Sequence, residues 1–273
     1  MQLGIGSFTY CWAVGVPGKI PSGPMTADGL VDRAHDLGLG LVQLCDNLQL
    51  EKLSEHQLGE LKEKSDDLGI KIEIGARGIK PEYLLGQLEL AVRFNSPILR
   101  VVIDSAGHKP SPEEVVQLLG GMIGEFEKAD VVIAIENHDR FTTLVFIEMI
   151  EEIGSSHVGI CLDTVNSFGA LEAPDVVVET LGRYVVNLHI KDFDIRRSDY
   201  SLGFVIEGTP AGKGRLDVPW LLEKLAGTGR DFNAILELWT PPERDIQATI
   251  AKEEAWAIQS IEYLRQVIPD CRN

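Results

Sequence analysis

The fold is predicted from three runs in the middle of the chain: VVIAIE at residues 131–136, VGICLD at 158–163 and VVNLHIK at 185–191. Each of these runs is short, apolar and rich in β-branched residues, as buried strands are. Amphipathic stretches at 141–153 and 174–183 separate the runs. Strands that alternate with helices in this way predict βαβ units and therefore a parallel sheet.

The same alternation extends to both ends of the chain. The candidate strands lie at residues 3–8, 39–46, 70–76, 98–104, 131–136, 158–163, 185–191 and 234–239. The candidate helices lie at residues 26–37, 51–68, 81–95, 111–129, 141–153, 174–183, 218–228 and 248–267. Eight such units in about 250 residues predict an α/β protein, a single-domain (β/α)8 TIM barrel over residues 1–273. A doubly wound sheet is the alternative, but SFTYCW at 7–12 lacks the glycine-rich phosphate loop that follows the first strand of that fold.

The composition argues against several classes of protein. The chain has 25 Lys and Arg against 42 Asp and Glu, a formal net charge of −17, which repels a phosphate backbone and argues against a nucleic-acid partner. The four cysteines, Cys11, Cys45, Cys161 and Cys271, form no CxxC pair, so a disulfide framework or a structural zinc site is not expected. No signal peptide and no apolar run of about 20 residues is visible, so we expect a cytoplasmic protein without a membrane partner.

Residues 193–215, after the seventh candidate strand, form the longest segment without a regular pattern. The segment contains Gly203, Gly208, Gly212 and Gly214. Loops of this length are uncommon unless they are functional or disordered, so we expect an irregular loop that acts as a lid.

Polar residues end four consecutive candidate strands, at the edge of a barrel where active sites lie. They are Glu136, Asp163, His189 and Glu237. Side chains alternate along a strand, and a large apolar residue that should pack outward directly precedes each of the four, so all four are predicted to point into the barrel. Salt bridges to loops are the alternative for any one of them. Three converging carboxylates repel one another unless a cation lies between them, so the set predicts one divalent ion: Mn²⁺, Mg²⁺, Co²⁺ or Fe²⁺, with Zn²⁺ as a further option.

A resemblance to a known family rests on the segments IENH at 135–138, LDT at 162–164, LHIKD at 188–192 and LE at 236–237. In these segments the chain resembles the xylose isomerase-like TIM barrels, a superfamily that includes sugar epimerases, inosose-metabolising enzymes, dehydroshikimate dehydratases and apurinic endonucleases. The resemblance covers essentially the whole chain. It implies that Glu136, Asp163, His189 and Glu237 bind one divalent metal ion. It also implies that Glu136 and Glu237 act as base and acid on opposite faces of the substrate.

The endonuclease branch fits this chain poorly. That branch builds a three-metal cluster with additional histidines, one of them three residues after the aspartate of the sixth strand. The corresponding residue here is Asn166, and the net charge opposes binding to DNA.

The remaining branches share chemistry at a one-metal site. We predict a divalent-metal-dependent sugar isomerase or epimerase that acts on a small keto sugar or sugar acid through a metal-stabilised enediolate. A lyase at the same site is the alternative, either a decarboxylase of a 3-keto sugar acid or a dehydratase, because loss of CO₂ passes through the same enediolate and loss of a β-hydroxyl starts from it. A non-catalytic carbohydrate-binding barrel is the third alternative. The exact substrate, its stereochemistry and the native metal stay open.

Residues near the four ligand candidates are predicted to bind the substrate. Lys191 shares the inward face of its strand with His189, and Arg196 follows closely. These cations favour a small polyhydroxy keto substrate that carries negative charge. The other substrate-binding candidates are His138, Asn166 and Trp12. Barrels of this family are often dimers or tetramers, so we expect a homo-oligomer.

Two charged residues lower in the barrel are predicted to pair. Glu73 and Arg100 both occupy inward positions on neighbouring strands. Because an isolated buried charge is costly, the sequence predicts an ion pair or a hydrogen-bonded layer beneath the site.

Overall fold

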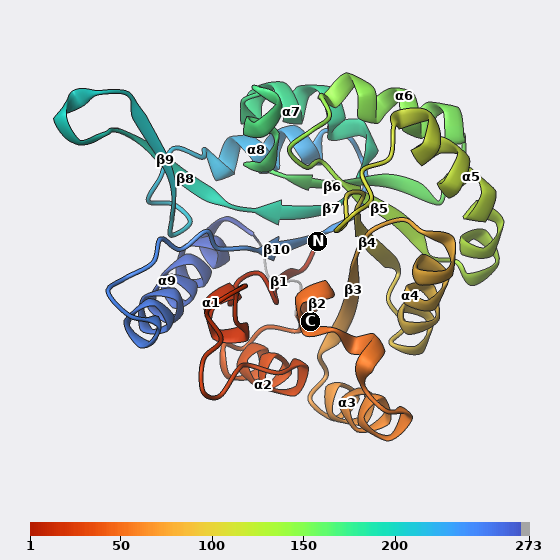
Figure 1. The fold of residues 1–273 in the computed structure, drawn as a ribbon, viewed down its shortest axis with the longest axis horizontal. Coiled ribbons are helices and arrows are strands. Elements are labelled where there is room, and N and C mark those ends of the chain that lie inside the picture. Colours follow the sequence, from red (N-terminus) through yellow and green to blue (C-terminus); the bar gives the residue numbers. More distant parts are fainter. Residues whose placement is uncertain (269–273) are drawn as a thin grey trace.

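The computed structural model describes residues 1–268, and eight parallel strands in it close into a barrel (Figure 1). Around the barrel the strands follow the order β1-β10-β7-β6-β5-β4-β3-β2. Their bounds are β1 Leu3–Gly6, β2 Leu41–Leu44, β3 Lys71–Arg77, β4 Ile98–Val102, β5 Val132–Glu136, β6 Val158–Asp163, β7 Val185–Ile190 and β10 Asn233–Leu236. Each of them overlaps a predicted strand, so the predicted (β/α)8 barrel is confirmed.

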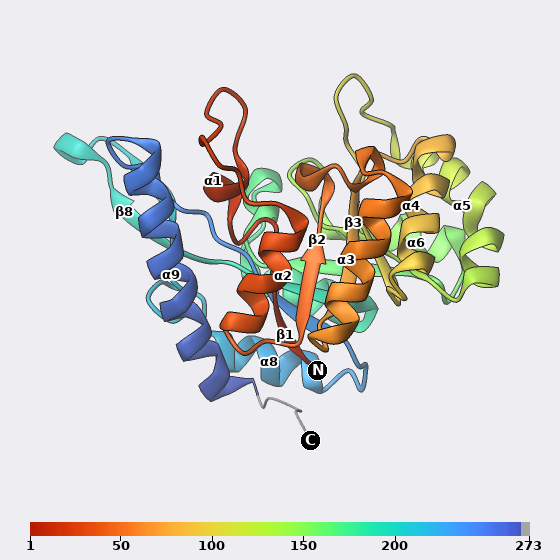
Figure 2. The same cartoon turned by 90° about the horizontal axis from the view of Figure 1, so that it is seen from below.

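Helices form the outer layer, and α2 and α3 run alongside β2 in the side view of Figure 2. The α-helices are α1 Cys11–Val14, α2 Ala27–Asp36, α3 Glu55–Asp67, α4 Pro81–Arg93, α5 Pro112–Ala129, α6 Thr143–Ile153, α7 Pro174–Leu181, α8 Val218–Ala226 and α9 Ile246–Val267. Short 3-10 helices lie at Asp46–Leu48, Leu50–Lys52, Asn166–Ala170, Gly182–Tyr184 and Asp199–Ser201.

The helix ends follow local sequence chemistry. Ser54 and Gln57 form a reciprocal capping box at the start of α3, and the Ser111 hydroxyl accepts the N–H of Glu114 at the start of α5. After α6, Gly154 takes a left-handed conformation with φ 66°, which side chains disfavour and glycine adopts freely. The end of α6 at Ile153 agrees with the end of the predicted helix at residues 141–153.

The barrel separates an apolar layer from a polar interior. Outward-facing strand residues pack under the helices in one hydrophobic core, and Ile5, Leu44, Ile74, Leu99, Ile133 and Ile135 are among its fully buried members. The interior contains buried polar side chains, including Gln43, Glu73, Arg100, Asn187 and His189. The alternation along each strand therefore places the functional groups inside the barrel and the apolar groups outside it.

Residues 193–215 are more regular than the sequence analysis predicts. Strands β8 (Asp192–Arg197) and β9 (Phe204–Thr209) pair as an antiparallel hairpin, which extends away from the barrel as an arm (Figure 1). At its base the buried Asp192 carboxylate accepts the N–H groups of Gly212, Gly214 and Leu216. The expectation of an irregular loop is therefore wrong, because two short strand patterns within the segment were overlooked, and its role as a lid stays a prediction.

The structure describes three of the four cysteines and all of the helices listed above. Cys11, Cys45 and Cys161 are free thiols, and Cys271 lies outside the described residues. No helix within residues 1–268 has the length and apolar character that crossing a bilayer requires.

Candidate metal centre

Four strand ends bring three carboxylates and one imidazole to a common point inside the barrel. Glu136 ends β5, Asp163 ends β6, His189 lies in β7 and Glu237 follows β10, and each is at most 1% exposed. His189 Nδ1 lies 3.2 Å from Glu237 Oε1, 3.4 Å from Glu136 Oε2 and 3.9 Å from Asp163 Oδ2. The inward orientation that the alternation predicts is therefore present on all four strands.

The chemistry of this donor set fits a divalent cation. His189 Nδ1 and Glu237 Oε1 are buried and have no hydrogen-bond partner within the described chain. Such atoms are costly to bury unless something binds them. One donor atom each from Asp163, His189 and Glu237 lies within 4.8 Å of the others. Glu136, Asp163, His189 and Glu237 could together hold one metal ion through oxygen and imidazole ligands.

Lys191 lies directly beside the carboxylates. Its Nζ is 2.7 Å from Asp163 Oδ2 and 2.8 Å from Glu237 Oε2. Burial disfavours the charged ammonium, but the two carboxylates outweigh burial and hold the pKa of Lys191 well above its usual value. Lys191 is therefore protonated and positively charged at the edge of the candidate metal centre.

Glu136 is held on both of its oxygens. Arg100 Nε donates to Oε2, and Asn166 Nδ2 donates to Oε1 at 2.6 Å. Burial alone would raise the pKa of Glu136, but the guanidinium of Arg100 and the imidazole of His189 lower it well below its usual value. Glu136 is therefore a permanently ionised carboxylate, a state that suits a metal ligand.

Glu237 is held less tightly than Glu136. Its Oε1 faces His189 without a hydrogen bond, and its Oε2 faces Lys191. Burial raises its pKa, whereas the electrostatic interactions with His189 and Lys191 lower it, and the net direction is downward. Glu237 therefore keeps one carboxylate edge available for exchange with a cation or a substrate.

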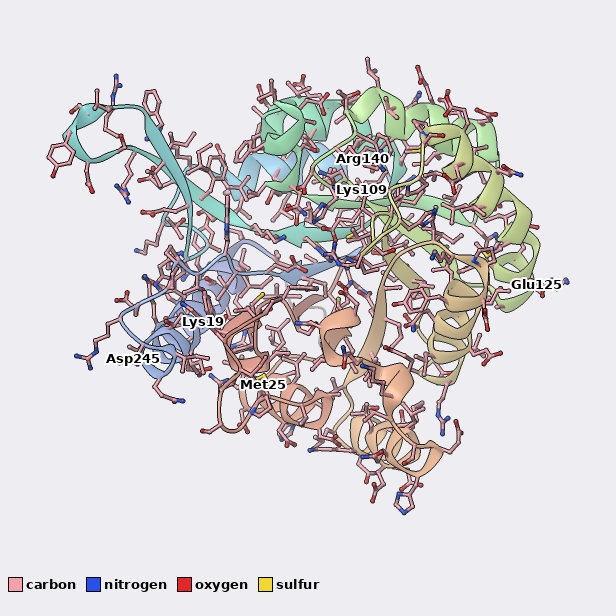
Figure 3. The ribbon with its side chains drawn as sticks, in the orientation of Figure 1. Lys19, Met25, Lys109, Glu125, Arg140 and Asp245 are labelled. Atoms are coloured by element: carbon pink, nitrogen blue, oxygen red, sulfur yellow. The ribbon has the colours of Figure 1, made fainter. Side chains whose placement is uncertain are left out.

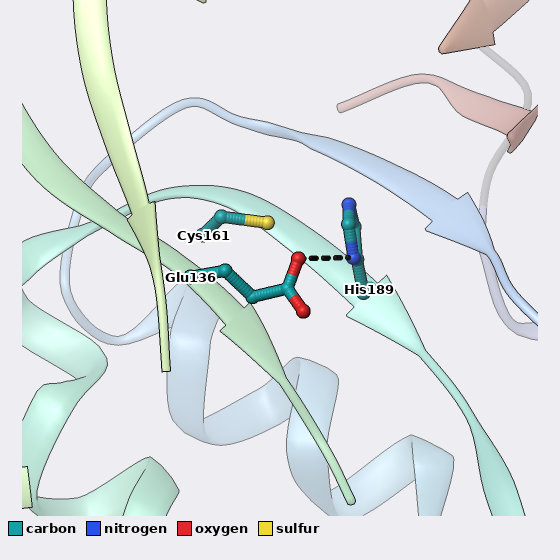
Figure 4. A group of neighbouring side chains, drawn as sticks. All are labelled: Glu136, Cys161 and His189. Atoms are coloured by element: carbon teal, nitrogen blue, oxygen red, sulfur yellow. Dashed lines mark ion pairs between the residues drawn. The ribbon is translucent and has the colours of Figure 1, made fainter. Parts of the chain in front are cut away.

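Cys161 lies close to the same point, on β6. Its sulfur belongs to a second potential ligand group with Glu136 and His189, and Figure 4 shows the three side chains converging from neighbouring strands. Burial raises the pKa of the Cys161 thiol well above its usual value, and the thiol donates to Asn187 Oδ1 at 3.4 Å. A thiol with a raised pKa is a weak ligand, so the oxygen-rich set is the better metal site.

A cavity of about 190 Å³ gives access to the centre. Its lining residues are Phe8, Cys11, Asn166, Lys191, Leu238 and Trp239. Two of the predicted substrate-binding residues, Asn166 and Lys191, thus face the entrance directly. His138 lines a neighbouring depression together with Glu136 and Arg140.

Trp12 and Arg196 make their hydrogen bonds elsewhere. The Trp12 indole donates to the Thr240 carbonyl at 2.9 Å. Arg196 lies on the outward-pointing hairpin, where it forms an ion pair with Glu207. Neither residue has a hydrogen bond or ion pair with the four ligand candidates in the described chain. Arg140 lies on the loop after β5 and forms an ion pair with Asp104 on the loop after β4. Its position is labelled in Figure 3.

The predicted pair of Glu73 and Arg100 does not form. Both side chains are buried in the barrel, but Arg100 is in register with Gly75, two residues beyond Glu73, so it lies one layer higher. Arg100 pairs with Glu136 and Asp46 instead. Glu73 accepts hydrogen bonds from Gln43, Asn187 and Asn233. The predicted ion pair was wrong because it ignored the stagger between neighbouring barrel strands, whereas the alternative prediction, a hydrogen-bonded layer, is present around Glu73.

Gln43 is a functional candidate that the sequence analysis missed. It is fully buried on β2, and its Oε1 lies 2.8 Å from His189 Nε2. The alternation of Val42, Gln43 and Leu44 already indicates that Gln43 points inward. Its contact with His189, which is 146 residues away in the sequence, depends on closure of the barrel.

Comparison with known proteins places this architecture in a family. A family model described as xylose isomerase-like TIM barrel matches residues 31–267. The chain belongs to the xylose isomerase-like TIM barrel family. It is also similar to a 3-oxo-isoapionate decarboxylase from Pectobacterium atrosepticum, with 32% identity over 264 residues that cover 97% of this chain and 95% of the relative.

Solved structures of similar fold include sugar epimerases. A D-psicose 3-epimerase from Clostridium cellulolyticum H10, solved with D-tagatose, has a TM-score of 0.73 and 17% identity over 98% of this chain and 99% of its own. The IOLI protein, solved with a zinc atom, has a TM-score of 0.67 and 17% identity over 98% of this chain and 100% of its own. At such identities the likeness shows the fold alone. Together with the decarboxylase relative, the family supports an enzyme of the sugar-modifying class.

Proposed function

We propose that this chain is a divalent-metal-dependent lyase that removes CO₂ from a 3-oxo sugar acid. The observation that carries the proposal is the full-length similarity to a 3-oxo-isoapionate decarboxylase, at 32% identity. The placement of Lys191 beside Asp163 and Glu237 supports it, because an ammonium at the entrance suits an anionic substrate. The proposed activity is therefore that of a lyase, which the sequence analysis gave as the alternative to an isomerase or epimerase.

The reaction breaks one C–C bond and forms one C–H bond. The bond between the carboxylate carbon and the carbon next to the ketone breaks, and CO₂ leaves. The electron pair moves onto the carbonyl and gives an enediolate, and the same carbon then takes up one proton. When bound, a divalent cation supplies Lewis acidity that stabilises the negative charge developing on nearby oxygens. Glu136, Asp163, His189 and Glu237 would hold that cation.

The chain's own residues supply orientation and the proton. Lys191 binds the substrate carboxylate at the entrance, and Asn166 lies beside it for a substrate hydroxyl. The Lys191–Glu237 pair then delivers the proton, because Lys191 Nζ contacts both Glu237 and the cavity. Epimerisation needs a second free carboxylate on the opposite face. Glu136 would have to serve there, and Arg100 and Asn166 already occupy both of its oxygens. Decarboxylation needs only one proton donor, so the arrangement favours it.

A neutral-sugar epimerase is the second candidate. It is favoured by the fold of the D-psicose 3-epimerases and by the positions of Glu136 and Glu237, each of which has a carboxylate oxygen close to His189 Nδ1. The proton-exchange roles that the resemblance implies for these two residues belong to this candidate.

One experiment separates the candidates. The purified protein is stripped with a chelator, reloaded with Mn²⁺ and incubated in D₂O with 3-oxo-isoapionate or with D-psicose. We expect one CO₂ per molecule of 3-oxo acid consumed, one deuterium in the product and no conversion of D-psicose. Conversion of D-psicose with all carbons retained, and no CO₂ from the acid, would establish the epimerase instead.

Two variants test the residue assignments in the same assay. Lys191→Met should lower CO₂ release by about 100-fold or more, the usual contribution of a positioned acid–base group. Lys213→Met removes a lysine on the exposed turn after the hairpin and is the matched control, which should keep wild-type activity. Equal activity of the two variants would remove Lys191 from the mechanism.

A further inference from the structure

A polar floor lies directly beneath the candidate metal centre. It consists of four side chains from four strands: Gln43, Glu73, Asn187 and Asn233. Glu73 Oε2 accepts from Gln43 Nε2 at 3.1 Å and from Asn187 Nδ2 at 2.9 Å, and Glu73 Oε1 accepts from Asn233 Nδ2 at 2.8 Å. Gln43, Glu73 and Asn187 are at most 1% exposed, so their hydrogen bonds form without competition from bulk water.

The hydrogen bonds of the floor fix which way each amide points. The Asn187 amide atom 2.9 Å from the Glu73 carboxylate faces an acceptor, so it must be the nitrogen. The Asn187 oxygen then faces the Cys161 thiol, which donates to it. The Gln43 atom that contacts both Glu73 Oε2 and Asn187 Oδ1 faces two acceptors, so it must be the nitrogen. A flipped Gln43 amide would set three oxygens against one another.

This orientation leaves one role for His189. Gln43 Oε1, at the other end of the same amide, lies 2.8 Å from His189 Nε2. An amide oxygen only accepts, so Nε2 carries the hydrogen and donates it. In the neutral imidazole, Nδ1 then holds the lone pair, and Nδ1 is the atom that faces the three carboxylates.

We propose that Gln43, held by the Glu73–Asn187 floor, is a positioning residue that locks His189 in the tautomer with the hydrogen on Nε2 and so presents Nδ1 to a divalent cation. Metal-binding histidines commonly donate their second N–H to a neighbouring acceptor, and loss of that acceptor typically weakens metal binding 10–100-fold. Here the acceptor is a neutral amide, and the buried carboxylate of Glu73 acts on it from one step further away. The inference rests on the proposed metal centre but not on the proposed reaction.

The test uses Zn²⁺ alone, without substrate. The wild-type protein is labelled with ¹⁵N-histidine and loaded with Zn²⁺, and the His189 signals are assigned by their loss in His189→Asn. We expect long-range ¹H–¹⁵N correlations of a ring protonated at Nε2 and metal-bound at Nδ1. The opposite pattern, with the proton on Nδ1, would by itself overturn the proposal, before any floor residue is substituted.

Two variants separate positioning from general stability. Gln43→Met has a similar volume but offers no acceptor, so the Kd for Zn²⁺ measured by calorimetry should rise by about 10–100-fold. Asn233→Ala removes one hydrogen bond to Glu73 without touching Gln43, and its Kd should stay within about threefold of the wild-type value. An equal loss of affinity in both variants, or none in Gln43→Met, would refute the role of Gln43. Because no substrate is present, a failure of the decarboxylation assay leaves these readouts unaffected.

Discussion

Removal of the Arg100 guanidinium leaves Glu136 as a buried carboxylate without its strongest partner. Arg100 is 2% exposed and Glu136 is 1% exposed, so neither group gains much from solvent when the pair is broken. Breaking a buried ion pair by removing one partner costs about 3–5 kcal/mol. We therefore expect Arg100→Met to lower the free energy of unfolding of the metal-free protein by about that amount. The hydrogen bond from Asn166 remains and places the loss toward the lower end of this range.

The loss should depend on the metal. A divalent ion held by Glu136, Asp163, His189 and Glu237 would itself compensate the charge of Glu136. The difference between wild type and Arg100→Met should then shrink by at least half in saturating Mn²⁺. An ion at 100 times its Kd adds about 2.7 kcal/mol to the stability of any variant that binds it, so both proteins are compared with and without the ion.

The assay is urea unfolding in chelator and in Mn²⁺, followed by circular dichroism. Arg77→Met is the matched control, because Arg77 pairs with the partly exposed Asp46 and its loss should cost at most about 1 kcal/mol. The double variant Arg100→Met with Glu136→Gln removes both charges and should recover part of the loss. A loss below about 1 kcal/mol in Arg100→Met, or one of equal size with and without Mn²⁺, would refute the proposed coupling of Arg100 to the centre.

Three further predictions address other parts of the molecule. Burial raises the pKa of Glu253 to about 7, so the folded state binds an extra proton between about pH 4.5 and 7. The free energy of unfolding therefore falls as the pH rises through this range, by at most about 1.4 kcal/mol per pH unit. Glu253→Gln should flatten that slope in urea titrations. A Cβ on Gly214 would overlap Asp192, so Gly214→Ala should lower the melting temperature by several degrees, whereas Gly120→Ala, with open space in α5, should not. Chelation should lower the melting temperature of wild type, with recovery on adding Mn²⁺, and Asp163→Asn should abolish this response; a response that persists would place the ion elsewhere.

The period-two pattern was sufficient to predict the barrel and the direction of its polar strand ends. Glu136, Asp163, His189 and Glu237 each directly follow an Ile or Leu residue that packs outward, and the alternation of side chains then turns the polar residue inward. Strand order then follows from the rule that consecutive βαβ units lie side by side with right-handed connections. These arguments need only local sequence and general topology.

Contacts between layers of the barrel could not be predicted in the same way. The partner of Arg100 depends on the stagger of β3 against β4, which local sequence does not encode, and this is why Arg100 meets Glu136 rather than Glu73. Gln43 and His189 are brought together only when β2 and β7 close on opposite sides of the interior. The hairpin after β7 was missed for a different reason, because the four glycines between residues 203 and 214 favoured a loop and obscured the short alternation of β8 and β9.

The charge of the buried centre bears on which substrate it accepts. Glu136, Asp163 and Glu237 contribute three negative charges, and Arg100 and Lys191 contribute two positive charges. These five side chains together carry one net negative charge. A divalent ion changes this to one net positive charge, in a site where water is largely excluded and unbalanced charge is costly. A monoanionic keto acid makes the centre neutral, whereas a neutral ketose leaves it positive. Without Lys191 the balance reverses, so Lys191→Met should raise KM for a keto acid while leaving the binding of a neutral ketose nearly unchanged.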